Sequence, residues 1–146
     1  MIGYLPPKKD QFIYMLSREE RIALVRTLAY LAHRDHTLVQ EEIDPISTIA
    51  YDLSLDPQII LANNGNPDLA HVLKPIKSEQ SKRIVIQELV NFAYIDNEYV
   101  QEERDAVRNI AEILDVEATV VANIEEWVER GRAWMQEGKQ LILGSE

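Results

Sequence analysis

Two short acidic segments, residues 35–44 and 96–105, hold the side chains best suited to chemistry. The first segment has no lysine or arginine, and its acidic residues are Asp35, Glu41, Glu42 and Asp44. The second has Arg104 as its single basic residue, and its acidic residues are Asp96, Glu98, Glu102, Glu103 and Asp105. Ca²⁺ and Mg²⁺ prefer carboxylate and carbonyl oxygens and take six or more of them. The pattern therefore favours a hard divalent cation that both segments bind together.

Neither segment alone has the pattern of an EF-hand. The second opens with Asp96-Asn97-Glu98, but Val100 stands where an oxygen ligand belongs, and no glycine follows at the sixth position. Acidic residues also occur at helix starts, where they accept hydrogen bonds from free backbone N–H groups and suit the helix dipole. Helix capping therefore competes with metal binding as the explanation, and the two roles are compatible.

Other kinds of site find less support. His33 and His36 lie three residues apart beside Asp35, a spacing that suits Zn²⁺, but a pair of surface histidines is the commoner case. The chain has no cysteine, no glycine-rich phosphate loop and no arrangement typical of a catalytic triad. We expect no catalysis, and a metal-dependent hydrolase is the least favoured alternative.

The two acidic segments occupy equivalent places in an internal repeat. Residues 22–56 match residues 83–117 without a gap, at a constant offset of 61, and the word Val-Gln-Glu-Glu recurs at 39–42 and 100–103. The identical pairs include Leu28 with Leu89, Ala32 with Ala93, Asp35 with Asp96, Asp44 with Asp105, Ile49 with Ile110 and Leu53 with Leu114. The match predicts a duplicated helix–loop–helix unit.

Apolar residues at helical spacing predict two helices in each unit. In the first unit, Ser17 and Glu20 form a capping-box pattern before a helix that should end near residue 34. Pro45 indicates that the next helix starts only shortly before it. In the second unit, Ser81 leads into a helix that is apolar around so much of its circumference that it should be central.

We expect one all-α domain over residues 1–146, a compact bundle of helices. Its parts are repeat one at about 17–56, a linker at 57–79, repeat two at about 80–117 and a C-terminal helix at 117–143. In the linker, Asp56-Pro57 predicts an N-cap with a short helix after it, and residues 67–73 add another. The glycines that should bend or fray the last helix are Gly131 and Gly138. The aromatic residues expected in the core or lining a groove are Tyr30, Tyr51, Trp127 and Trp134.

Composition restricts location and partners. The chain has 46% hydrophobic residues, 5 glycines and a formal charge of −10, from 25 acidic and 15 basic residues. A strongly acidic protein repels nucleic acid and anionic lipid, so we expect no nucleic-acid binding, no membrane insertion and a basic or stress-related protein partner. With no apolar leader or membrane-length run, we expect a cytoplasmic protein. The sequence leaves the oligomeric state open and is compatible with a homodimer.

Both acidic segments resemble the signature of the TerB-like (tellurite resistance) family. That signature is a helix ending in Ala-x-x-Asp-Gly, an apolar residue three after the aspartate, and glutamates six and seven after it. The positions that match are Ala32, Asp35, Leu38, Glu41 and Glu42 in the first unit and Ala93, Asp96, Tyr99, Glu102 and Glu103 in the second. His36 and Asn97 replace the glycine. The chain is also similar to the N-terminal helical domain of co-chaperones of the DjlA type.

The resemblance implies an all-helical domain of about seven helices whose acidic clusters bind a divalent cation, in a tellurite-resistance or stress setting. Carried onto this sequence, the metal-binding residues would be Asp35, Glu41, Glu42, Asp96, Glu98, Glu102 and Glu103. Ca²⁺ or Mg²⁺ is favoured over Zn²⁺, because the residues supply oxygen ligands. The alternative is a metal-free scaffold for protein interactions.

Overall fold

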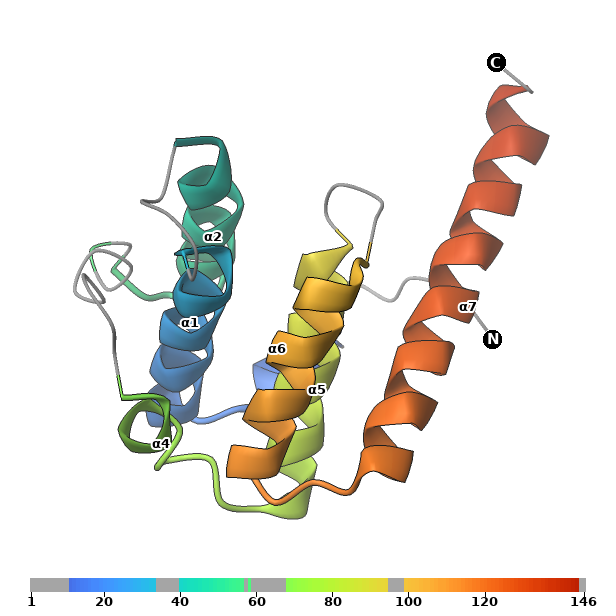
Figure 1. The fold of residues 1–146 in the computed structure, drawn as a ribbon. Coiled ribbons are helices and arrows are strands. Elements are labelled where there is room, and N and C mark those ends of the chain that lie inside the picture. The colour runs from blue at the N-terminus through green and yellow to red at the C-terminus, as the bar shows by residue number, and fades with distance from the viewer. Residues whose placement is uncertain (1–10, 34–39, 57, 59–67, 95–98, 145–146) are drawn as a thin grey trace.

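A computed structural model of the chain describes residues 11–33, 40–56, 58, 68–94 and 99–144, without the side chains of residues 33 and 40–44. All regular structure in this part is helical, as expected (Figure 1). In chain order the elements are η2 (Phe12–Met15, a 3-10 helix), α1 (Arg18–His33), α2 (Gln40–Asp52), α4 (Leu69–Val72), α5 (Glu79–Ala93), α6 (Gln101–Ile113) and α7 (Ala118–Leu143). The short η2 helix carries no sequence signal that we recognised.

Helix α5 is the central element. It contacts α1, α6, α7 and η2, while α2 packs on α1 and α4 contacts both α1 and α6. The largest fully buried side chains come from every long helix except α7: Leu24, Val25, Leu28, Leu31, Ile46, Leu53, Val85, Ile86, Leu89, Val90 and Ile110. A helix that buries side chains around most of its circumference needs neighbours on several sides, so the predicted central position is confirmed.

The helix starts follow capping rules. Ser17 N–H donates to Glu20 Oε1 at 2.7 Å and Glu20 N–H donates to Ser17 Oγ at 3.2 Å, which is the predicted capping box. In the second unit the cap is Ser78 rather than Ser81, and Ser78 Oγ accepts the Ser81 N–H at 3.0 Å. The expectation for Ser81 was wrong because the polar residues 79–83 form the first turn of α5 instead of preceding it.

Helix α2 begins earlier than Pro45 predicted. It starts at Gln40, so Pro45 lies inside the helix, where the proline ring removes one backbone hydrogen bond. Ile46 and Ala50 are completely buried, and α2 packs along α1. Burial of this face compensates for the lost bond, which shows tertiary packing prevailing over a local helix breaker.

Positions 61 residues apart have the same local structure. The bounds of α2 and α6 differ by 61 at both ends, and α1 and α5 begin 61 residues apart. Ser54 and Asp115, also 61 apart, are the two described non-glycine residues with positive φ, at 63° and 60°. The residue after each donates its N–H to a carbonyl five residues back, from Leu55 to Ala50 and from Val116 to Ala111, at 2.8 Å in both cases.

The connections and the last helix complete the chain. Asp56 Oδ1 accepts the Gln58 N–H, as expected for an N-cap, whereas the predicted helix after it lies outside the described residues. Asp68 caps α4, the second predicted linker helix.

Helix α7 runs unbroken for 26 residues through both of its glycines, so the predicted fraying is wrong. Each glycine removes only one side chain from a helix with intact hydrogen bonding.

The aromatic residues are more exposed than predicted. Tyr51 is 78% exposed, and Trp127 and Trp134 are 50% and 40% exposed, so none of the three is a core residue; Tyr30 packs partly buried against the core. Tyr51 falls on the α2 face opposite Ile46 and Ala50, and the two tryptophans lie beside rather than on the buried stripe of α7. The described helices include none with the length and apolar character of a membrane span.

Candidate functional site

The structure describes only part of the predicted cation site. Asp35, Asp96 and Glu98 lie outside the described residues, as do the side chains of Glu41 and Glu42. Their helices are described, however. Figure 1 shows that α1 and α5 end, and α2 and α6 begin, at the same end of the molecule. We call this the joint end, because it holds the four described helix ends that the two connections join in sequence.

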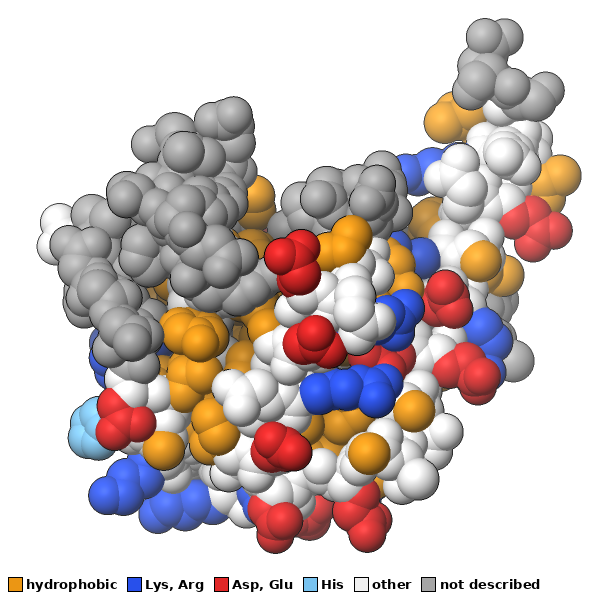
Figure 2. Space-filling model, in the orientation of Figure 1, with side chains coloured by type: hydrophobic (Ala, Val, Ile, Leu, Met, Phe, Trp, Pro, Cys, Tyr) orange, Lys and Arg blue, Asp and Glu red, His pale blue; other side chains and the backbone are white. Residues whose placement is uncertain are grey.

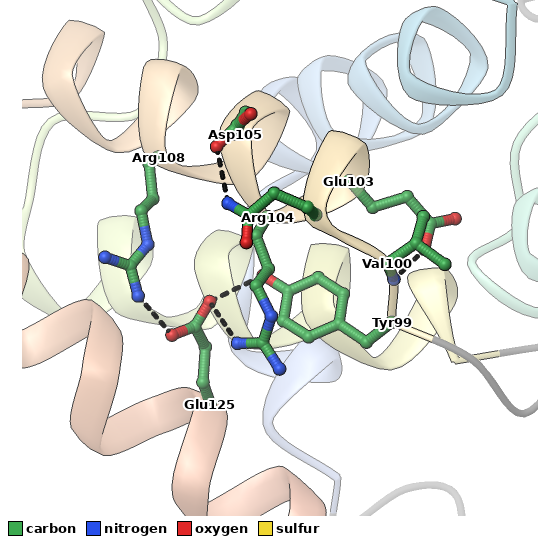
Figure 3. A network of polar contacts seen from close by, with 8 residues as sticks. Tyr99, Val100, Glu103, Arg104, Asp105, Arg108 and Glu125 are labelled. Atoms are coloured by element: carbon green, nitrogen blue, oxygen red, sulfur yellow. Dashed lines mark hydrogen bonds and ion pairs between the residues drawn. The ribbon is translucent and has the colours of Figure 1, made fainter.

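Two predicted ligands, Glu102 and Glu103, lie in the first turn of α6 and have different surroundings. Glu102 is exposed. The Glu103 side chain turns back, and its Oε1 accepts the Val100 N–H at 3.1 Å (Figure 3). This contact satisfies a backbone donor that the helix itself leaves free. Glu103 therefore performs the capping role that the sequence offered as the alternative to metal binding.

A buried polar cluster joins the start of α6 to α7 beside these residues. Glu125 of α7 is 7% exposed, and its Oε2 accepts the Tyr99 O–H at 2.7 Å while its Oε1 accepts an Arg108 N–H at 2.7 Å. Arg104 lies 3.7 Å from Oε2 and stacks over the Tyr99 ring, 4.3 Å from the ring centre (Figure 3). Two arginines and a phenol thus stabilise one buried carboxylate.

A second contact holds the other side of the same connection. Tyr94 caps the C-terminus of α5, and its backbone oxygen accepts an N–H of Arg132 at 2.9 Å. The Arg132 guanidinium also lies 4.7 Å from the centre of the Tyr94 ring, and that ring packs on Tyr99 with centroids 5.3 Å apart. Glu125 and Arg132 are seven residues apart on α7, so one face of α7 holds both ends of the connection between α5 and α6. We call this set of contacts the α7 clamp.

The surroundings of the α7 clamp raise the pKa of both of its tyrosines. Burial, the hydrogen bond to Glu125 and the negative charge of that carboxylate raise the pKa of Tyr99 far above its ordinary value. Burial and the charge of Glu129 raise the pKa of Tyr94. Both phenols therefore stay protonated and act as hydrogen-bond and packing groups rather than as bases.

Arg104 forms its described ion pair outside the acidic segment in which it lies. It is the only basic residue among residues 96–105, and its guanidinium is directed at Glu125 of α7. The negative charge of the neighbouring acidic residues is therefore compensated less than the sequence alone indicates, which favours cations near the joint end.

Sequence reasoning missed Glu125. The signal was present in the sequence, because Val121, Ile124 and Val128 recur around Glu125 at helical spacing and such a pattern predicts a buried face. A carboxylate on such a face needs a basic or hydrogen-bonding partner. Tyr99, by contrast, was expected to fill an apolar position, and its ring is buried.

Comparison with known proteins gave no match: no family profile, no curated protein and no solved structure is significantly similar to this chain. The family resemblance of the acidic segments therefore stays a prediction. Within the part of the chain that the structure describes, three or more potential metal ligands do not come together. Five of the seven predicted ligands fall outside the described side chains, so the prediction of a joint cation site also stands as a prediction.

Proposed function

We propose that the chain is a TerB-like module made of two duplicated units, which binds a divalent cation at its joint end and recognises a protein partner. The observation that carries this proposal is the position of the helix ends on either side of the two connections. The carboxyl ends of α1 and α5 and the amino ends of α2 and α6 all lie at one end of the molecule (Figure 1). Acidic residues of both connections are thereby brought toward a single region, where several oxygens can surround one ion.

The equivalent local structure of the two units supports the duplication. Equal helix bounds, equal hydrogen bonds after α2 and α6, and positive φ at Ser54 and Asp115 are each expected of two copies of one unit. Glu20 and Ser81 are also 61 residues apart, and the Ser81 side chain lies near enough to the Glu20 carboxyl to help lower its pKa against the opposing effect of burial. Contact between equivalent residues is what an approximate twofold axis between α1 and α5 produces.

The α7 clamp supports the link between the cation and a partner. Tyr94 and Tyr99 bracket residues 95–98, which include the predicted ligands Asp96 and Glu98, and both tyrosines contact α7. A cation bound by residues 95–98 would act on a segment whose two sequence neighbours, Tyr94 and Tyr99, both belong to the α7 clamp. The chemistry required of the chain is recognition, so we propose a binding module rather than an enzyme.

A calorimetric titration tests the proposal. Metal-stripped protein should bind Ca²⁺ or Mg²⁺, and Asp96→Asn with Glu103→Gln should abolish binding while the helical circular dichroism stays unchanged. A matched control, Glu112→Gln with Asp115→Asn, removes two carboxylates at the other end of α6 and should bind like the parent. Absence of binding tighter than about 1 mM in the parent would overturn the cation site.

A metal-free interaction scaffold is the second candidate, and the hydrogen bond from Val100 N–H to Glu103 favours it. In this case the only role of the Glu103 carboxylate is to cap the start of α6. In metal-free buffer Glu103→Ala should then lower the free energy of unfolding by about 0.5–1 kcal/mol more than Glu102→Ala, its exposed neighbour. Added Ca²⁺ or Mg²⁺ should change the stability of neither variant nor of the parent.

A further inference from the structure

The C-terminal half of α7 projects beyond the other helices with its hydrophobic side chains exposed (Figures 1 and 2). Trp127, Trp134 and Leu141 follow one another at intervals of seven residues, so they form one line along the helix surface. Trp127 and Trp134 are about half exposed, Leu141 is 78% exposed, and Phe12 of η2 extends the line by packing on Trp127 with ring centroids 6.3 Å apart. We call these four residues the α7 stripe. The rest of the described chain leaves about half of each aromatic side chain and most of Leu141 uncovered.

The residues beside the stripe repeat with the same interval of seven. Arg130 and Glu137 flank one side of it, and Gly131 and Gly138 flank the other. A Cβ placed on either glycine would meet no atom within 4 Å, so packing within the chain does not require glycine there. Glycine inside a helix costs about 0.5–1 kcal/mol relative to alanine, and it suits a position that another backbone approaches closely.

We propose that the α7 stripe is the interface of a homodimer, in which α7 packs against α7 of a second copy in antiparallel orientation, with the twofold axis at Trp134. In this register Trp134 meets its own counterpart, and Trp127 lies opposite the partner's Leu141. Arg130 lies beside the partner's Glu137, which gives two opposite-charge contacts by symmetry, and Gly131 lies beside the partner's Gly138. A twofold axis places each row of flanking residues beside the same row of the partner. Because the two residues of each row are seven apart, Arg130 meets Glu137 and Gly131 meets Gly138 in both directions.

Charge and area agree with a second copy as the occupant. The chain carries −10 overall, but residues 130–143 contain Arg130, Arg132 and Lys139 against Glu137 alone, so the projecting half of α7 lacks the acidic charge that would repel another copy. Within the described residues Glu137 forms no ion pair, and Arg130 pairs only with the exposed Glu126 at 3.0 Å. Two stripes would bury about 1,000 Å² in total, which is the lower limit for a specific interface.

Variants that reverse or exchange the charges of Arg130 and Glu137, measured by sedimentation equilibrium, test both the dimer and its register. The parent mass should rise with concentration from 16.8 kDa towards twice that value. Arg130→Glu alone and Glu137→Arg alone each create two like-charge contacts across the axis and should raise the dissociation constant about tenfold. The double variant exchanges the charges and should restore the parent affinity. Glu112→Arg on α6 makes the same charge change away from the stripe and should leave the mass unaltered.

A cysteine placed on the proposed axis gives an independent measurement, because the chain has no cysteine of its own. Trp134→Cys should be joined into covalent dimers by a short bismaleimide, and Ile113→Cys, exposed on α6, should not. A parent that stays monomeric at every concentration, or single charge variants that dimerise like the parent, would overturn the proposal. Since no cation enters this interface, a failure of metal binding would leave the dimer unaffected.

Discussion

Glu88 is the residue whose charge is least well accommodated in the described part of the chain. It lies on α5 within the buried arc between Ile84 and Phe92, and no hydrogen bond or ion pair joins its carboxylate to another described residue. Burial raises the pKa of Glu88 to about 7. The equivalent residue of the first unit is Thr27, which is fully buried and satisfies its hydroxyl by donating to Ala23 O at 2.7 Å. Residues 27 and 88 are thus both polar, but Thr27 is fully buried and satisfies its hydroxyl locally, whereas Glu88 is half-buried and has no described partner.

We expect Glu88→Gln to make the protein more stable above neutral pH. The folded-state pKa of this carboxyl is raised above 4.5, so the folded chain binds more protons than the unfolded chain between pH 4.5 and 7, and stability falls as pH rises through this window. At pH 8 the variant should exceed the parent by up to about 3 kcal/mol, since the pKa rises from 4.5 to about 7 and one pKa unit corresponds to about 1.4 kcal/mol. Near pH 4.5 the two should be alike.

Urea unfolding at both pH values measures the difference, with Glu112→Gln as the control. Glu112 lies exposed on α6, so its loss should change stability little at either pH. An equal gain for Glu88→Gln at pH 4.5 and pH 8 would mean that side-chain packing, rather than ionisation, separates the two proteins.

At the scale of elements, α7 owes its position to the clamp as well as to apolar packing. Glu125 accepts a short hydrogen bond from Tyr99 inside the fold, and Val121 and Val128 on the same face are buried. A hydrogen bond to a buried carboxylate contributes more than one between neutral groups, because the charge is poorly solvated. Arg104 and Arg108 are partly exposed, so water replaces part of their interaction when it is lost.

A double-mutant cycle on Tyr99→Phe and Glu125→Gln should give a coupling free energy of about 1–2 kcal/mol. The cycle of Tyr99→Phe with Glu126→Gln changes the neighbouring glutamate, which is exposed, and should give a value near zero. The free energies come from urea unfolding. Equal coupling in the two cycles would show that Tyr99 senses the charge of α7 in general and not the Glu125 carboxylate.

The helices of the repeats were predictable because each has a strong apolar period and a polar start. The Ser17 capping box, the central α5 and the extension of α7 to Leu143 all follow from local patterns. The start of α2 was not predictable, because Pro45 argues against it locally and only packing on α1 outweighs that argument. The clamp needs residues 94–132 to be folded together, so no local pattern contains its geometry.

The candidate cation site, too, was predictable in part from local sequence and in part depends on tertiary packing. Spacing identified the acidic segments, and the structure shows that their helices end together. The direction of each carboxylate is a tertiary property. Glu102 and Glu103 are adjacent in sequence, yet one is exposed and the other returns to Val100 N–H. Arg104 likewise turns towards Glu125 of α7, a partner that sequence proximity does not reveal.

At the scale of the whole molecule, net charge opposes compactness. The 25 acidic residues outnumber the 15 basic ones, so the folded chain holds like charges closer together than the unfolded chain does. The proposed dimer would bring two such chains together through a helix segment that is locally basic. The excess of acidic charge in the fold and the charge of the proposed interface both depend on screening, so the response to salt tests the electrostatic argument.

We expect moderate salt to leave the fold unchanged in stability or to stabilise it. Raising NaCl to about 0.1 M shortens the screening length to about 10 Å, which weakens repulsion between exposed carboxylates. Glu125 and its partners are buried and lose less, because screening by mobile ions requires solvent access. The free energy of unfolding in urea, measured with a chelator to exclude divalent cations and at a concentration where the protein is monomeric, should rise by up to about 1 kcal/mol. A fall of that size would mean that exposed ion pairs such as Arg130 with Glu126 contribute more to stability than the excess of acidic charge takes away.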